Sequence, residues 1–473
     1  MSRMHDIGPK MTSVFSSHRR RVAGQDDKTA GTNLSAGGVG SHQPTEPRRW
    51  NPYLLHKLKA VLPWPAYLAW RRCAGAIRHL LTGAPRRRAD QGRGVENYWR
   101  ERMPRLARPG LRNDTILLRS YYGEVANCNP YGVHQAIHRL GLDWTILWAV
   151  KDLDVALPQG GIPVVIGSRQ WYEALARVRY SVWNVHQQPV WYRKNPGQVM
   201  VQTFHGYPFK LAGMPYWPGA GFNEDRIRSY LERHADWDYL VSPAPYATPL
   251  LEECFPGARH LLEIGYPRND IFFDPARGQI REEVRHRLGI PGDTTAVLYA
   301  PTYRDWLSDN ETSAQASELL SPANLARSLS PDHVVLMRGH PMEARGGGSR
   351  PGGARVIDVT AYPRVEELCL ASDAGVFDYS SLRFDYALTG KPMVFFVPDL
   401  DQYLTQERGS LIPYEPTAPG PYCRTLDDLS GLLGSLDRLT TDYASRRAQF
   451  IQDYLPLEDG HAGERLVRAL LES

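Results

Sequence analysis

The chain has 473 residues, of which 42% are hydrophobic, with 56 Lys and Arg against 51 Asp and Glu. At about 150 residues per domain this length predicts two or three domains, and the apolar fraction excludes a wholly disordered or fibrous chain. Because no apolar run reaches about 18 residues, a polytopic membrane protein is also excluded. The N-terminus lacks the apolar region of a secretory signal, and none is expected.

The positive charge is concentrated at the start of the chain. Residues 1–110 carry 21 Lys and Arg against 7 Asp and Glu, which leaves 35 and 44 for the remainder. Residues 1–49, rich in Ser, Gly and Arg, predict a disordered basic tail. Residues 50–110 are predicted to form a segment bound to an anionic membrane surface, because residues 50–82 place Leu and Trp at helical spacing opposite Arg and Lys, and three arginines follow at 86–88. A helix packed on the protein's own body is the alternative, and no nucleic-acid motif accompanies the charge.

Alternating strands and helices fill the rest of the sequence. Residues 111–289 predict a first domain and 290–473 a second, with Gly289 to Asp293 as the linker. Short aliphatic runs bounded by turn residues predict the strands, and helical spacing predicts the segments between them. This order is typical of parallel sheets, so we expect two Rossmann-like α/β domains. Strands are expected at 115–118, 144–150, 162–166, 180–184, 198–204, 238–241, 296–299, 333–337, 355–358, 374–377 and 392–396.

Polar side chains follow several of these strands, where parallel sheets collect their ligands. His205 follows a strand and precedes a glycine, and a histidine at such a tip can act as a general base. Lys210, a few residues on, could neutralise phosphate. The Gly-x-Pro-Arg-Asn turn that carries Arg268 and Asn269 offers a guanidinium suited to phosphate. Each residue could instead be purely structural, and it is their combination that favours a ligand site.

The second domain repeats the pattern. Thr302 and Arg304 follow one predicted strand, and Arg338 and His340 follow the next. The segment Asp378-Tyr379-Ser380-Ser381-Leu382-Arg383-Phe384-Asp385 follows a third strand, and its serines are expected to cap a helix that runs to about residue 388. A helix N-terminus with two hydroxyls can bind an anion. Two histidines, two arginine turns and this helix together favour a nucleotide diphosphate as ligand.

These segments resemble the CDP-glycerol glycerophosphotransferases, the teichoic acid glycerol-phosphate primases and polymerases. The resemblance covers roughly residues 115–455, and its motifs occur in the family's order. It is carried by QTFHGYPFK (202–210), APTYRD (300–305), His340-Pro341, DYSSLRFDY (378–386) with Lys391-Pro392, and Asp399 to Tyr403 with Arg408-Gly409.

The resemblance implies a GT-B architecture, with two Rossmann-like domains facing a cleft. It implies transfer of glycerol phosphate or a related alditol phosphate from a CDP-alditol to a glycerol-phosphate or lipid-linked polymer acceptor, with release of CMP. His205 falls on the motif histidine that acts as general base, and His340 on one that binds the donor pyrophosphate. The donor-binding residues expected from the motifs and turns together are Lys210, Arg268, Asn269, Thr302, Arg304, Arg338, Asp378, Ser380, Ser381 and Asp385.

Membership would also place the protein peripherally on the cytoplasmic face of the cell membrane. Five scattered cysteines without a CxxC pair fit a reducing compartment. No metal cluster or acidic pair of DxD type stands out, so we expect neither metal nor cofactor, and cationic side chains and helix N-termini should stabilise the leaving group.

The sequence departs from the family at three positions, where Trp usually stands in place of Phe204 and Thr in place of Tyr207 and Phe377. Tyr207 is expected to narrow the pocket beside His205, and Phe377 to remove a hydroxyl near the donor. Two other functions remain open: a GT-B glycosyltransferase that uses a nucleotide sugar, and a membrane-docked scaffold without activity. The sequence does not distinguish glycerol from ribitol, a primase from a polymerase, the acceptor or the oligomeric state.

Overall fold

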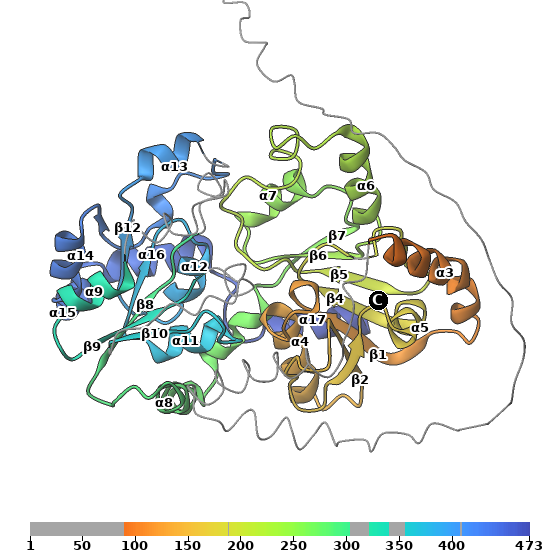
Figure 1. Ribbon diagram of the computed structural model, residues 1–473, viewed down its shortest axis with the longest axis horizontal. Coiled ribbons are helices and arrows are strands. Elements are labelled where there is room, and N and C mark those ends of the chain that lie inside the picture. The colour runs from red at the N-terminus through yellow and green to blue at the C-terminus, as the bar shows by residue number, and fades with distance from the viewer. Residues whose placement is uncertain (1–88, 188, 303–320, 340–354, 407–408) are drawn as a thin grey trace, which may run out of the picture. The chain divides into compact units, whose positions relative to one another are not determined.

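The computed structural model describes residues 89–187, 189–302, 321–339, 355–406 and 409–473 (Figure 1). The predicted basic tail and most of the predicted membrane-associating segment, residues 50–88, lie outside the described residues. Among the helices that are described, none is both long and apolar enough to cross a membrane.

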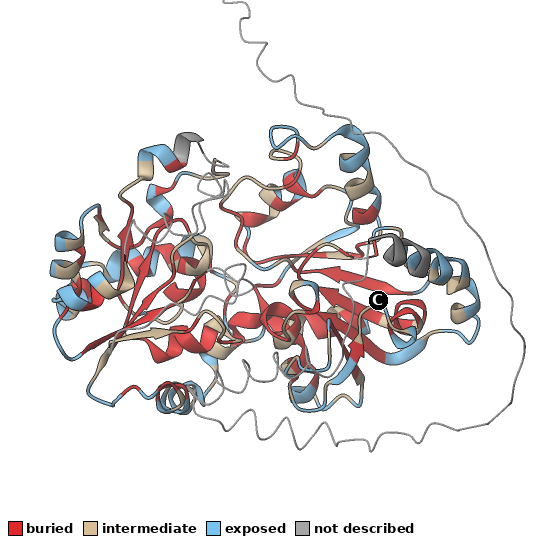
Figure 2. Cartoon of the chain, in the orientation of Figure 1, coloured by how far each residue is buried: buried red, intermediate tan, exposed pale blue. Residues whose placement is uncertain are grey.

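The first sheet has seven strands, all parallel, in the order β3-β2-β1-β4-β5-β6-β7. Its central strands are almost wholly buried on both faces, as the aliphatic runs predict for a parallel sheet covered by helices (Figure 2). The strands are β1 (Arg112–Arg119), β2 (Thr145–Val150), β3 (Ile162–Val165), β4 (Val178–Trp183), β5 (Val199–Gln202), β6 (Tyr239–Ser242) and β7 (His260–Glu263).

Helices connect these strands, and polar side chains fix where two of them begin. Ser168 accepts a hydrogen bond from the Trp171 amide at the start of α5, and Asn223 accepts one from the Arg226 amide at the start of α6. The elements are α3 (Ala89–Ala107), the 3₁₀ helix η1 (Tyr121–Gly123), α4 (Cys128–Arg139), α5 (Arg169–Arg177), α6 (Glu224–His234), α7 (Ala247–Cys254) and the 3₁₀ helix η2 (Pro267–Phe273).

The second sheet has six strands, also all parallel, in the order β10-β9-β8-β11-β12-β13. They are β8 (Thr295–Tyr299), β9 (His333–Met337), β10 (Val356–Asp358), β11 (Ala374–Phe377), β12 (Met393–Phe396) and β13 (Tyr422–Cys423). Its helical elements are α8 (Arg277–Leu288), α9 (Pro322–Ser328), α11 (Val365–Ala371), α12 (Leu382–Ala387), α13 (Leu400–Gln406), η5 (Glu415–Thr417), α14 (Leu426–Leu433), α15 (Leu436–Asp442), α16 (Ala444–Tyr454) and α17 (Ala462–Leu471).

The predicted α/β alternation with two parallel sheets is confirmed, but two helices cross the predicted boundary. Helix α8, assigned to the first domain, packs on α11 beside the second sheet, where Arg285 donates to the Ala371 carbonyl and pairs with Asp373. Helix α17, at the end of the second domain, packs on α4 and η2 of the first. Leu466, whose side chain is fully buried, belongs to a core that runs through both sheets. Each sheet is therefore covered in part by a helix that the sequence assigned to the other domain.

Helix α3 covers the last part of the predicted membrane-associating segment. Its Trp99 ring stacks on Tyr172 of α5, with ring centroids 5.0 Å apart. Met103 and Leu106 pack against the same buried cluster of the first sheet. Residues 89–107 therefore form a helix packed on the protein's own body, whereas residues 50–82, for which the sequence left this alternative open, lie outside the described residues.

Candidate active site

His205 lies just beyond β5, in a loop beside the end of the neighbouring strand β4. Its Nδ1 is 2.7 Å from the carbonyl oxygen of Asn184, the first residue after β4. A carbonyl can only accept, so Nδ1 carries the proton, and in the neutral ring Nε2 keeps its lone pair. The backbone thus selects the tautomer that can take a proton through Nε2.

The protonation state of His205 follows from its surroundings. The residue is exposed, yet enough protein surrounds the ring for desolvation to lower its pKa below the ordinary value. The hydrogen bond to Asn184 opposes this shift, and the nearby positive charge of Arg268 adds to it. A lowered pKa keeps the imidazole neutral, and therefore basic at Nε2, at neutral pH.

Unfavourable backbone geometry gathers around this histidine. Among the described residues, the non-glycine residues with positive φ are Tyr121 (42°), Tyr122 (59°), Cys128 (60°) and Phe204 (48°). Phe204 directly precedes His205, and the Tyr121 ring lies 4.9 Å from the His205 ring, centroid to centroid. Such residues cost about 1–3 kcal/mol each and persist only where the surroundings enforce them, typically at functional sites.

Specific hydrogen bonds hold this strained backbone. The Asn129 side-chain amide donates to the Phe204 carbonyl at 3.1 Å. The Tyr121 backbone amide donates to the Asn184 side-chain oxygen at 2.8 Å. Asn129, Asn184 and Tyr121 were not among the site residues predicted from the sequence. Asn184 could have been found, because it ends the strand predicted at residues 180–184, at the carboxyl end where parallel sheets collect their ligands.

Arg268 and Asp385 form a buried pair beneath the His205 loop. The guanidinium donates to both carboxylate oxygens of Asp385, at 2.8 and 2.9 Å, and through Nη1 to the His205 carbonyl at 2.6 Å. Asn269, also buried, donates to the Tyr207 hydroxyl at 3.0 Å. The predicted roles of these three residues as donor ligands stay predictions. The contacts seen here join η2 and α12 to the loop that carries His205.

On the second sheet, β8 and β11 are neighbours and bring Thr302 and Asp378 together. The Thr302 backbone amide donates to both oxygens of Asp378 at 2.9 Å, and its hydroxyl donates to one of them at 2.7 Å. Ser380 accepts from the Leu382 amide at 3.3 Å, whereas Ser381 makes no side-chain capping bond to α12. The expected capping is thus found for Ser380 alone.

Gly206 brings the two predicted halves of the site together. A Cβ atom built on Gly206 would lie 3.0 Å from the Ser381 hydroxyl oxygen. The His205 loop of the first sheet therefore approaches the serine turn of the second so closely that only glycine fits without a shift.

The remaining predicted site residues are less directly placed. The Lys210 ammonium lies 5.4 Å from the centre of the Tyr403 ring. Arg338 follows β9 and donates to the carbonyls of Val359 and Tyr362. Arg304 and His340 lie outside the described residues, so of the two predicted catalytic histidines only His205 can be placed.

One expectation about the departures from the family pattern, that Tyr207 narrows a pocket beside His205, needs correction. The Tyr207 side chain is buried, its ring stacks on Phe384 with centroids 4.9 Å apart, and its hydroxyl donates to Glu458. It therefore points into the core and does not narrow a pocket beside His205. Phe377 is also buried, where its ring meets Tyr386 edge-on at 5.1 Å.

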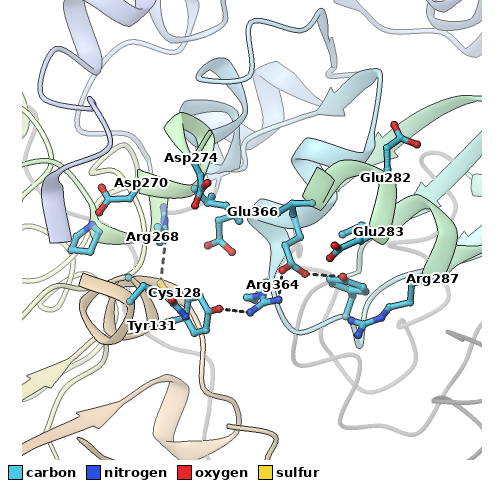
Figure 3. A pocket seen from close by; sticks show the side chains of 18 of the residues that line it. Cys128, Tyr131, Arg268, Asp270, Asp274, Glu282, Glu283, Arg287, Arg364 and Glu366 are labelled. Atoms are coloured by element: carbon cyan, nitrogen blue, oxygen red, sulfur yellow. Dashed lines mark hydrogen bonds and ion pairs between the residues drawn. The ribbon is translucent and has the colours of Figure 1, made fainter. Parts of the chain in front are cut away.

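A cavity of about 970 Å³ lies between α4, η2, α8 and α11 (Figure 3). Cys128, Arg268 and Glu366 line it, and Arg268 is the one predicted site residue among its lining residues. Arg364 donates to the Tyr131 hydroxyl, as a dashed line in Figure 3 shows, and it also pairs with Glu367. The His205–Ser381 region differs from this cavity in that it holds a histidine whose Nδ1 is bonded to a backbone carbonyl.

Comparison with known proteins identifies the family. The profile of a family described as CDP-glycerol:poly(glycerophosphate) glycerophosphotransferase matches residues 102–472. The chain is 30% identical over 365 residues to the teichoic acid glycerol-phosphate transferase of Staphylococcus aureus, covering 76% of this chain and 92% of that one. It is 28% identical over 373 residues to the teichoic acid poly(glycerol phosphate) polymerase of Bacillus subtilis. That match covers 78% of this chain but only half of the polymerase.

Solved structures give the same result. A variant of the wall teichoic acid polymerase TagF superposes with a TM-score of 0.70 and 27% identity, covering 81% of this chain and 96% of the other. A second TagF variant, soaked with CDPG, superposes with a TM-score of 0.69. The chain belongs to the CDP-glycerol:poly(glycerophosphate) glycerophosphotransferase family.

Proposed function

We propose that the protein transfers an alditol phosphate from a CDP-alditol, such as CDP-glycerol, to a hydroxyl of a cell-wall or surface polymer, and releases CMP. Family membership supports this reaction. So do the relatives, which are teichoic acid glycerol-phosphate and ribitol-phosphate transferases, primases and polymerases.

The orientation of His205 carries the proposal. In the proposed step an oxygen of the acceptor hydroxyl attacks the phosphorus of the alditol phosphate, and the bond from that phosphorus to the CMP oxygen breaks. The hydroxyl proton passes to Nε2 of His205, whose lone pair is available because Nδ1 donates to the Asn184 carbonyl. The negative charge that develops on CMP requires cationic or hydrogen-bonding groups in fixed positions.

The donor is proposed to bind on the side of the second sheet. Thr302, Asp378, Ser380 and Ser381 lie at the carboxyl ends of β8 and β11, where ligands collect in parallel sheets. The proposal includes a GT-B arrangement, in which a donor domain and an acceptor domain face a cleft. Arg304 and His340 remain donor ligands by the sequence motif.

We also propose that residues 50–88 bring the enzyme to the cytoplasmic face of the membrane. This segment places Trp and Leu among Arg and Lys, and the first 88 residues hold 16 Lys and Arg against 4 Asp and Glu. Basic residues near an anionic lipid surface contribute about 1 kcal/mol each. The acceptor is then a polymer that is itself held at the membrane.

Incubation with separate donors tests the reaction. The purified protein is given CDP-glycerol, CDP-ribitol, or representative UDP- and GDP-sugars, together with a short soluble glycerol-phosphate acceptor. We expect CMP release and a phosphodiester product with one of the CDP-alditols, and the preferred donor identifies the alditol. Release of UDP or GDP with a glycoside product would make the protein a glycosyltransferase. Absence of turnover with every donor would favour the scaffold.

A further inference from the structure

The segment between α16 and α17 passes directly beneath the His205 loop and carries a buried glutamate, Glu458, that contacts this loop. Glu458, 8% exposed, accepts three hydrogen bonds on Oε1. The donors are the Tyr207 hydroxyl, the Tyr266 backbone amide at 3.0 Å and the Asn269 side-chain amide at 3.1 Å. A single oxygen atom therefore joins the C-terminal segment to the His205 loop and to η2.

The partners of Glu458 are the groups that hold His205. The Tyr266 hydroxyl donates to the Gly206 carbonyl at 3.0 Å, and Asn269 donates to the Tyr207 hydroxyl at the same distance. Arg268, two residues after Tyr266, donates to the His205 carbonyl. The backbone from His205 to Tyr207 is thus held by a network that meets at Glu458.

The close approach of this segment has a cause in the sequence. Gly265 has a φ of 80°, and a Cβ atom at this position would lie 3.0 Å from the Leu457 carbonyl oxygen and 3.2 Å from Glu458 Oε2. Only glycine allows both the backbone conformation and the contact.

The surroundings of Glu458 favour its neutral form. Its hydrogen-bond donors are uncharged, and Glu458 Oε2 has no partner among the described residues. Asp385 of α12, itself paired with Arg268 of η2, repels a second negative charge on Glu458. The neighbouring Asp459 pairs with Arg465 of α17. Burial first, and Asp385 in addition, raise the pKa of Glu458 to about 8, although the hydrogen bonds that it accepts oppose the shift.

We propose that Glu458 is a positioning residue for the transfer reaction: its Oε1 fixes the His205–Tyr207 loop so that Nε2 of His205 meets the acceptor hydroxyl. This inference rests on the proposed function, because it assigns His205 as the base. The residue touches no substrate and acts through Tyr207, Tyr266 and Asn269.

The test compares Glu458→Ala and Glu458→Gln with wild type, and uses Asp453→Asn, an exposed carboxylate on α16, as the matched control. Near neutral pH, Glu458→Ala should lower kcat for CMP release by about tenfold or more, with the donor KM within about twofold, because the residues proposed to hold the donor on the second sheet are not among the hydrogen-bond partners of Glu458. Glu458→Gln keeps a neutral acceptor of the same shape and should recover most of that loss. Asp453→Asn should match wild type. Circular dichroism checks that each variant is folded.

The pH profile separates positioning from a merely structural role. Above about pH 8 the wild-type Glu458 ionises against Asp385, so kcat should fall as the pH rises, whereas Glu458→Gln should lack this fall. If Glu458→Ala keeps its kcat within about twofold while His205→Ala is inactive, the inference is wrong and the proposed function stands.

A measurement that needs no turnover tests the inference if the wild-type protein proves inactive. If the wild type uses no CDP-alditol, the proposed function fails, and nitrogen-15 NMR of labelled histidines still reports on the loop. Comparison with His205→Asn assigns the His205 signals. They should show protonated Nδ1 and bare Nε2 in wild type, and a mixture of tautomers in Glu458→Ala. An unchanged His205 tautomer in Glu458→Ala would overturn the inference by itself.

Discussion

At the scale of single residues, a backbone carbonyl determines what His205 can do. The Asn184 carbonyl takes the Nδ1 proton, so the base function falls on Nε2. His205→Ala removes that lone pair and should lower kcat by about 10²- to 10⁴-fold, the usual contribution of a general base. Donor binding, measured by calorimetry with CDP-glycerol, should be nearly unchanged. Retention of more than about a tenth of the wild-type kcat would assign the base elsewhere.

The pH dependence of wild-type turnover follows from the same residue. A base must be neutral, and desolvation lowers the pKa of His205 below its ordinary value near 6.5. The neutral form therefore predominates down to a pH below 6.5, so kcat should reach half of its maximum only at a pH below that value. A half-maximal point above about 6.5 in the acidic limb would contradict this.

Gly206 offers a residue-scale test of the contact between the two loops. Gly206→Ala would place its Cβ 3.0 Å from the Ser381 hydroxyl oxygen, so this hydroxyl must shift away from its position. We expect a donor KM raised by several-fold, and partial recovery when Ser381→Ala is added, which removes the opposing oxygen. Gly278→Ala is the matched control, because a Cβ atom at Gly278 meets nothing within 4 Å. Equal kinetics for Gly206→Ala and Gly278→Ala would show that the two loops are not in contact.

At the scale of elements, the Arg268–Asp385 pair ties η2 to α12. Asp385→Asn leaves a buried guanidinium without its counter-ion and should destabilise the fold by about 3–5 kcal/mol. The exposed Arg169–Glu173 pair within α5 provides the control, since Glu173→Gln should cost at most about 0.5 kcal/mol. Urea unfolding measures both. If Asp385→Asn lowers the free energy of unfolding by less than about 1 kcal/mol, the pair contributes little to the stability of the contact between η2 and α12.

The elements also show where sequence reasoning succeeds and where it stops. The predicted strands at His333–Met337 and Ala374–Phe377 are confirmed, because buried parallel strands are written as continuous aliphatic runs. The edge strand β7 was missed, since His260 and Glu263 are exposed and break that pattern. The α/β class and the strand tip at His205 were predictable from such local signals.

Contacts distant in sequence were not predictable from local patterns. The turn around Arg268 and the motif around Asp385 each predicted a residue that binds the donor. Only the fold shows that the two side chains form a buried ion pair with each other. Glu458 carries no motif at all, because its role comes from a segment that returns to the first sheet. Periodicity and turn chemistry describe a residue's neighbours in the chain, whereas these partners are set by tertiary packing.

At the scale of the whole molecule, the basic N-terminal region and the α/β body should be separable, and α3 shows where to divide them. Removal of residues 1–88 takes away 16 Lys and Arg and 4 Asp and Glu, and it leaves α3 packed on α5. We expect this truncated protein to stay folded and to keep turnover on a short soluble acceptor. It should lose sedimentation with vesicles that contain anionic lipid, whereas full-length binding should weaken with salt through screening.

A longer truncation is the matched comparison. Removal of residues 1–110 also deletes Trp99, Met103 and Leu106, and so exposes the apolar surface that they cover on the first sheet. Because burial of each large apolar side chain contributes about 1.5–3 kcal/mol, this protein should unfold at a clearly lower temperature than the one starting at residue 89. Equal vesicle binding by full-length protein and the shorter truncation would contradict the membrane role of the first 88 residues. Equal melting temperatures for the two truncations would show that α3 contributes nothing to the stability of the body.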